Sequence, residues 1–205
     1  MLKNIVSFAI VLCLFVGCAN PFENFENMVE CKKNADKMSG CIEKVPYKNY
    51  KNDVFRIETT YKNGVKNGFE KWYRWNQQLE KYILITETPY KDGKIHGVKK
   101  DYYDSGAIQT EYSYKNDERE WLKVYYDNGV LYSKMLYKND KKHGVERIYY
   151  KSGQLKEEIP YKEGGITGIL KRYHENGVLY YEAPYKNDLM QGGEKYYDEF
   201  GNLEE

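Results

Sequence analysis

The sequence has almost no net charge: 32 Lys and Arg stand against 31 Asp and Glu, which leaves +1 at pH 7, and no long block carries one sign. A protein that binds nucleic acid needs a basic surface to neutralise phosphates. We therefore expect no nucleic-acid partner. There is also no Ser-His-Asp or Cys-His set, and no loop ending in Gly-Lys-Ser/Thr that would cradle a phosphate. We expect no catalytic residue and no cofactor, so the chain should not be an enzyme.

Histidine is scarce as well, with three in the chain. His96 and His143 each precede a glycine at corresponding places of the pattern described below. Four strands at about 4.8 Å each would place them roughly 19 Å apart, too far to share an ion. His174 has no obvious acidic partner, and we expect no metal site.

Tyrosine is the abundant residue. The 23 Tyr and 17 Gly contrast with 7 Phe, 5 Pro and 3 Trp. A tyrosine ring is apolar, while its hydroxyl needs a hydrogen-bond partner or water. This composition favours a thin, half-solvated sheet over a thick apolar core.

Only the N-terminus has a long apolar run. It follows Lys3, extends from Ile5 to Val16, and is too short to span a bilayer comfortably as a permanent helix. The ending Phe15-Val16-Gly17-Cys18 resembles a bacterial lipoprotein signal, although that motif usually has Leu where Phe15 stands. We expect residues 1–17 to be a signal peptide and Cys18 to carry lipid, which would anchor the chain to a membrane of the bacterial cell envelope. An ordinary cleaved signal peptide or an uncleaved anchor are the alternatives.

Residues 18–46 should form a short segment before the main domain. Phe22, Phe25, Met28 and Val29 recur at three- and four-residue intervals and continue to Met38, which predicts a short amphipathic helix over 22–38. Cys31 and Cys41 can form a disulfide outside the cytoplasm. Two free thiols are the alternative, and we expect no zinc site because no histidine or further cysteine lies nearby.

Internal repetition dominates the remainder, residues 47–205. Six Tyr-Lys pairs follow one another at intervals of 29, 24, 23, 24 and 24 residues. A glycine stands seven positions after each tyrosine, except in the third unit, which has Trp121. A second turn with Asn-Gly or Ser-Gly follows in most units. The paired tyrosines are Tyr61, Tyr90, Tyr114, Tyr137, Tyr161 and Tyr185.

Each unit should be a β-hairpin. Segments such as 97–103 and 107–114 have strand length, are rich in Tyr and β-branched residues, and end at glycine-containing turns. Asn-Gly and Ser-Gly supply the positive φ that tight turns need. Pro89, Pro160 and Pro184 recur just before the Tyr-Lys pair, where a missing backbone donor predicts a bulge, an unpaired strand end or the turn itself.

Two further sets of residues recur with the repeat. The first has a Glu three positions before the paired tyrosine, where it should face cross-strand lysines as ordinary sheet pairing and not as a catalytic acid. The second, twelve positions after that tyrosine, forms a ladder that either packs structurally or serves as an aromatic binding face. The glutamates are Glu58, Glu87, Glu111, Glu158 and Glu182, and the ladder consists of Tyr73, Tyr102, Tyr126, Tyr149, Tyr173 and Tyr197.

A unit of the form Gly-x4-Tyr-Tyr-x2-Gly-x7-Tyr-Lys-x-Gly/Asp resembles the MORN repeat variant of bacterial proteins. The resemblance is closest over 97–117, 144–164 and 168–188, and extends roughly over 47–205, most of the mature chain. It implies an all-β fold, an elongated, single-layer, twisted antiparallel sheet of tandem hairpins with one tyrosine-rich face curved into a groove. Bacterial relatives of this kind often carry the label of YwqK-like antitoxins.

These patterns predict a membrane-anchored, non-catalytic module for protein interaction or envelope scaffolding. The expected partners are another protein and, through Cys18, the membrane. End-to-end self-association is a further expectation because both ends of an open sheet present edge strands. The alternative function is an antitoxin or immunity-type protein that binds and neutralises a toxin.

Overall fold

The computed structural model describes Cys31, residues 41–49 and residues 53–204. Within these ranges the chain is all-β, without a helix, and no segment is a helix long and apolar enough to cross a membrane. The predicted signal peptide, the lipidation site at Cys18 and the helix over 22–38 lie outside the described residues. Cys31 is disulfide-bonded, and its pairing with Cys41 stays a prediction because the side chain of Cys41 is not described.

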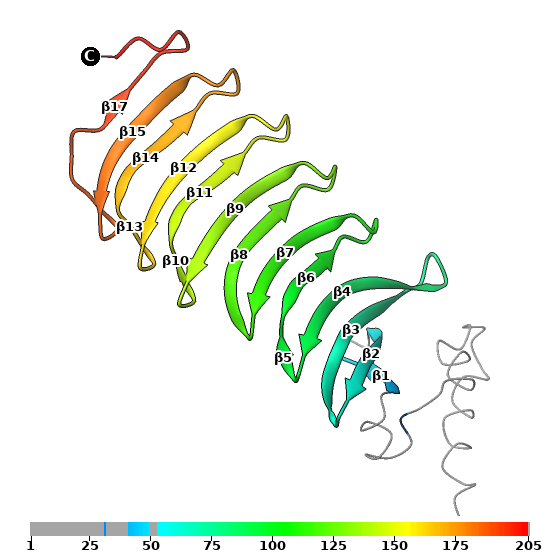
Figure 1. The fold of residues 1–205 in the computed structure, drawn as a ribbon. Coiled ribbons are helices and arrows are strands. Elements are labelled where there is room, and N and C mark those ends of the chain that lie inside the picture. The colour runs from blue at the N-terminus through cyan, green and yellow to red at the C-terminus, as the bar shows by residue number, and fades with distance from the viewer. Residues whose placement is uncertain (1–30, 32–40, 50–52, 205) are drawn as a thin grey trace, which may run out of the picture.

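All strands of the described residues belong to a single 17-stranded sheet. The pairings of the described strands are antiparallel and join strands that are consecutive or next but one along the chain, so the hairpins lie side by side in sequence order along an elongated, curved sheet (Figure 1). The strands are β1 Cys41–Lys48, β2 Val54–Lys62, β3 Val65–Asn76, β4 Lys81–Lys91, β5 Lys94–Ile95, β6 Gly97–Tyr102, β7 Ile108–Lys115, β8 Glu118–Tyr125, β9 Leu131–Lys138, β10 Lys141–Lys142, β11 Gly144–Tyr149, β12 Leu155–Lys162, β13 Gly165–Ile166, β14 Gly168–Tyr173, β15 Leu179–Lys186, β16 Leu189–Met190 and β17 Lys195–Tyr196. The expected all-β sheet of tandem hairpins is confirmed, and it begins at β1, before residue 47.

The tight turn of each unit follows the Tyr-Lys pair. Both central residues have positive φ, the geometry of a type I′ hairpin turn, which matches the twist of the flanking strands. Half of these turns end in Asp instead of Gly. The carboxylate of Asp188, for example, accepts the N–H of Ile166 at 2.7 Å in the preceding unit. The turns are Asn63-Gly64, Asp92-Gly93, Asn116-Asp117, Asn139-Asp140, Glu163-Gly164 and Asn187-Asp188.

The Asn-Gly and Ser-Gly turns lie at the other end of the hairpins and are wider. The N–H of Gly106 donates to the carbonyl of Tyr103 at 2.9 Å, and the N–H of Tyr103 donates to Ala107 at 2.9 Å. In this turn only Gly106 has positive φ, as in a type I turn followed by a glycine bulge. The sequence correctly located these turns, but the two-residue turns are those after Tyr-Lys.

A bulge interrupts one strand of most units and explains the recurrent proline. At Pro160 the carbonyl accepts the N–H of Thr167 at 2.9 Å, and Gly168 follows with φ of 128°. A residue in a strand directs its N–H and C=O to the same side, so the donor that Pro160 lacks faces this bulge. Of the three places that the sequence left open for the prolines, the structure shows the bulge.

Neighbouring units are also joined by tyrosine side chains at the wide-turn end. The hydroxyls of Tyr103, Tyr126 and Tyr150 donate to backbone carbonyls of the next unit, at 2.7, 2.9 and 2.8 Å. His174 occupies this place in the following unit and packs on the Tyr180 ring, with 4.8 Å between centroids. Neighbouring units are thus joined by backbone pairing throughout, and in several units also by turn carboxylates or tyrosine hydroxyls.

The core is thin, as the tyrosine-rich composition predicts. In the described part of the chain, Met135 is the one large side chain that is fully buried, with 1% exposure. A small cluster of Leu170, Tyr181 and Ala183 lies near the C-terminal end. Most other apolar side chains of the described residues are half-buried or exposed.

Candidate interaction surface

The two faces of the sheet carry different residues because side chains alternate along every strand. We call one the Tyr-Lys face, since it carries the paired tyrosines Tyr61, Tyr90, Tyr114, Tyr137, Tyr161 and Tyr185. We call the other the Glu face, since it carries Glu58, Glu87, Glu111, Glu158 and Glu182. Strand β9 shows the alternation clearly: Ser133 and Met135 are buried on the first face, while Lys134 and Leu136 are exposed on the second. Tyrosines line both faces, which differs from the single tyrosine-rich face that the MORN resemblance implies.

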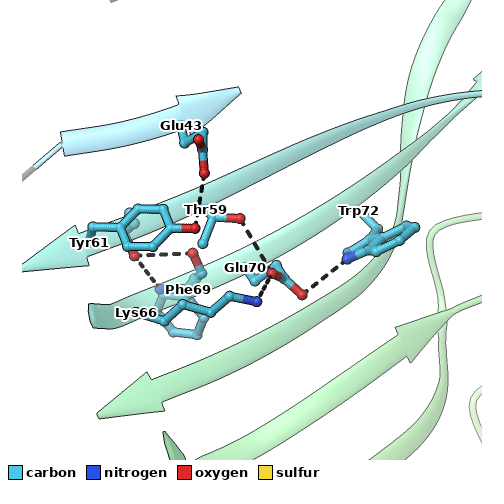
Figure 2. A network of polar contacts seen from close by, with 8 residues as sticks. Glu43, Thr59, Tyr61, Lys66, Phe69, Glu70 and Trp72 are labelled. Atoms are coloured by element: carbon cyan, nitrogen blue, oxygen red, sulfur yellow. Dashed lines mark hydrogen bonds and ion pairs between the residues drawn. The ribbon is translucent and has the colours of Figure 1, made fainter. Parts of the chain in front are cut away.

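The Tyr-Lys face is a network of internally satisfied polar groups. Figure 2 shows its N-terminal part, where Glu70 accepts from Thr59 at 3.3 Å and from the Trp72 indole at 3.2 Å, and forms an ion pair with Lys66. Tyr61 donates to Glu43 at 2.9 Å in the same view. These carboxylates are occupied by neighbouring donors, which is what a structural network requires.

A shallow hollow of about 340 Å³ adjoins this network. Its lining includes Glu70, Trp72, Tyr90 and Lys99, and Lys66 lies 4.8 Å from the centroid of the Tyr90 ring. Among the described residues, no group of three or more His, Cys, Asp or Glu side chains is arranged to hold a metal ion. The hollow is an open depression between satisfied side chains, and it presents no nucleophile paired with a base.

On the Glu face, the recurrent glutamates pair with cross-strand cations, as the sequence predicts. A carboxylate oxygen of Glu87 lies 3.4 Å from Nζ of Lys71, and one of Glu158 lies 2.9 Å from Nε of Arg147. In the last pair, an oxygen of Glu182 lies 3.2 Å from Nζ of Lys195. The fourth unit departs from this pattern, because Lys134 occupies the place of the glutamate.

A row of tyrosines runs beside these glutamates. Hydroxyls donate to the carboxylates at 3.3 Å for Tyr73, 2.8 Å for Tyr125, 3.1 Å for Tyr173 and 3.1 Å for Tyr197. At four of its six positions the predicted ladder is thus a row of Tyr–Glu hydrogen bonds, and no rings of this row contact one another in the described part of the chain. The structure places Tyr125, and not the expected Tyr126, in the row. The reason is that the third unit is one residue shorter at its bulge, where Ser113 pairs with Trp121. The row consists of Tyr73, Tyr102, Tyr125, Tyr149, Tyr173 and Tyr197.

On the other side of the glutamates lies an apolar row that the sequence reasoning missed. Phe69 is paired with Pro89, Trp121 with Leu136, Val145 with Pro160 and Ile169 with Pro184. Four of these side chains are substantially exposed: Phe69 at 44%, Leu136 at 44%, Val145 at 37% and Ile169 at 52%. The signal was present in the sequence as an apolar residue just after the repeat glycine. Contiguous exposed apolar surface is typical of interaction sites.

Tyrosine titration gives a test of the Tyr–Glu bonds. Burial and then the hydrogen bond to Glu111 raise the pKa of Tyr125 to about 12, and burial and the bond to Glu158 do the same for the pKa of Tyr173. An unfolded tyrosine has a pKa near 10, so above about pH 10 the folded chain keeps protons that the unfolded chain releases. The free energy of unfolding should therefore be unaffected by these groups below about pH 10 and fall as the pH rises toward 12.

Urea unfolding at about pH 9 and about pH 11 measures this slope. Tyr173→Phe should reduce the loss of stability at the higher pH. Tyr132→Phe, at an exposed position without a recorded hydrogen bond in the described part, is the control. Equal slopes for all three proteins would contradict the role of the Tyr–Glu bonds.

The geometry defines a tandem β-hairpin repeat protein whose Glu face carries an apolar row, a charged row and a tyrosine row. Comparison with protein families identifies the repeat: residues 95–116, 122–139, 142–163 and 166–187 match the family model of the MORN repeat variant. The interruption before residue 122 coincides with the shorter bulge of the third unit. A comparison with curated proteins gives no match. The four matching units confirm the MORN resemblance, and such repeats suggest a module for protein or membrane interaction.

Proposed function

We propose that this chain is a non-catalytic protein-interaction or scaffold module, attached to the bacterial cell envelope through lipid on Cys18. The observation that carries the proposal is the Glu face. Its exposed apolar row runs beside ordered charges and tyrosines over successive units, the combination of apolar centre and hydrogen-bonding groups found at protein interfaces. The described residues offer no catalytic set, which favours binding as the activity.

A partner capture experiment tests the binding function. The full chain is cross-linked and purified from envelope extracts, together with a variant in which Leu136 and Val145 are both changed to Ser. These side chains are exposed, so the variant should fold and lose a defined partner that the unchanged chain retains. Recovery of the same proteins by both chains, or of no defined protein, would contradict the proposal. If the captured partner is a toxin whose activity the chain neutralises on co-expression, the function is of the immunity type.

The anchor is tested separately. Labelled palmitate should be incorporated into the chain and be absent from a Cys18→Ser variant. Without incorporation, the anchor part of the proposal fails while the binding part stands.

A further inference from the structure

The charged row on the Glu face alternates in sign from strand to strand over most of the sheet. Each carboxylate faces a cation on both neighbouring strands, the arrangement that stabilises cross-strand pairs. In spatial order the row is Lys44, Glu58, Lys71, Glu87, Lys100, Glu111, Lys123, Lys134, Arg147, Glu158, Lys171, Glu182 and Lys195.

The alternation is interrupted at one place, where Lys134 faces Lys123 on β8 and Arg147 on β11. Like charges directly opposite each other destabilise a sheet. Tyr149 also lacks the carboxylate that Tyr73, Tyr125, Tyr173 and Tyr197 use, since the residue at that place is Lys134. Two unfavourable features, the like charges on neighbouring strands and the missing acceptor for Tyr149, therefore coincide at Lys134. Such departures from a repeated pattern are typical of functional sites.

We define the cationic patch as Lys123, Lys134 and Arg147. Lys134 is exposed and forms no ion pair with any described residue. The ammonium of Lys123 lies over the Trp121 ring, 4.8 Å from its centroid. Arg147 forms an ion pair with Glu158, with 2.9 Å between Nε and Oε1. The patch thus presents the Lys134 ammonium, which has no ion-pair partner among the described residues, between two further cations.

Apolar and aromatic side chains border the patch on both sides. Trp121, Leu136 and Val145 belong to the apolar row on one side. Tyr125, Tyr132 and Tyr149 lie on the other, and Tyr132 is exposed at 37%. Arg, Trp and Tyr are the residues most enriched at the centre of protein interfaces.

We infer that the cationic patch is the docking site for an acidic segment of a protein partner, with apolar side chains beside its carboxylates. Charge complementarity carries the choice of occupant: the carboxylates supply the negative charges that the row lacks between Lys123 and Arg147, and the Tyr149 hydroxyl gains an acceptor. The exposed apolar row beside the patch fits a partner that also brings apolar side chains, and this favours a protein over a nucleic acid. The inference rests on the proposed interaction function and names the chemistry of the partner.

A binding assay with the full chain tests the inference. The probe is a short fluorescein-labelled peptide of alternating Glu and Leu, and its polarisation is compared with that of a Lys and Leu peptide. The unchanged chain should bind the acidic peptide, less tightly as salt is raised, and should not bind the basic one. Lys134→Glu should weaken binding at least about tenfold, while Lys186→Glu, the same charge change at the distant and exposed end of β15, should alter it less than about twofold.

Lys134→Glu also restores the alternating row and the acceptor for Tyr149, so its melting temperature should equal or exceed that of the unchanged chain. A loss of binding in a more stable protein cannot come from misfolding. Binding that survives Lys134→Glu overturns the inference, as does absence of binding to the acidic peptide. Preference for anionic vesicles or an RNA oligomer over the acidic peptide overturns it as well. If Leu136 and Val145 are needed to capture a partner and Lys134 is not, the proposed function stands and this inference falls.

Discussion

Replacing Met135 by Ala should lower the free energy of unfolding by about 2–3 kcal/mol, toward the lower end of the range for a buried methionine. Met135 is 1% exposed and faces Leu122 across β8 and β9. A sheet one layer thick has little other apolar volume with which to fill the space that the truncation leaves. Urea denaturation followed by circular dichroism measures the change.

The adjacent residue provides the control. Leu136 has a similar size but points to the opposite face and is 44% exposed, so Leu136→Ala should cost only about 0.5 kcal/mol. The same substitution should affect partner binding, because Leu136 belongs to the apolar row. Comparable losses of stability at the two positions would show that the faces are not divided in this way.

The second large effect should come from the bulge glycines. Gly168→Ala should destabilise the chain by about 3 kcal/mol, because φ is 128° and an added Cβ would lie 3.0 Å from Cγ of Pro160. Gly177 has φ of 87° at a wide turn, and a Cβ there would meet nothing within 4 Å. Gly177→Ala should therefore cost only the left-handed backbone strain, about 1 kcal/mol.

A double-mutant cycle separates strain from crowding. Adding Pro160→Ala to Gly168→Ala should recover the part of the loss that arises from contact with the proline ring. If the two glycine substitutions cost the same, the close approach between Gly168 and Pro160 does not constrain the bulge.

The repeat pattern was sufficient to predict the all-β sheet, the turn positions and the charge pairing, since each depends on residues close in sequence or one strand away. It failed at Tyr126 because a fixed count of twelve residues ignores the shorter bulge of the third unit. A one-residue gap at Trp121 would have placed Tyr125 in the row. The sequence shows that Lys134 replaces the recurrent glutamate in one unit. Only the strand register shows that Lys123 and Arg147 lie on either side of it. The apolar row was missed because each strand contributes one member to it, so the row becomes visible only once the register of the strands is known.

The direction of the backbone hydrogen bonds has a mechanical consequence. Bonds between antiparallel strands lie perpendicular to the strands, and the strands lie across the long axis of this sheet (Figure 1), so the bonds point along that axis. A pull on the two ends of the sheet is then carried by the outermost strand first, and not by many bonds loaded together in shear. Such a molecule yields one hairpin at a time and lengthens stepwise under tension.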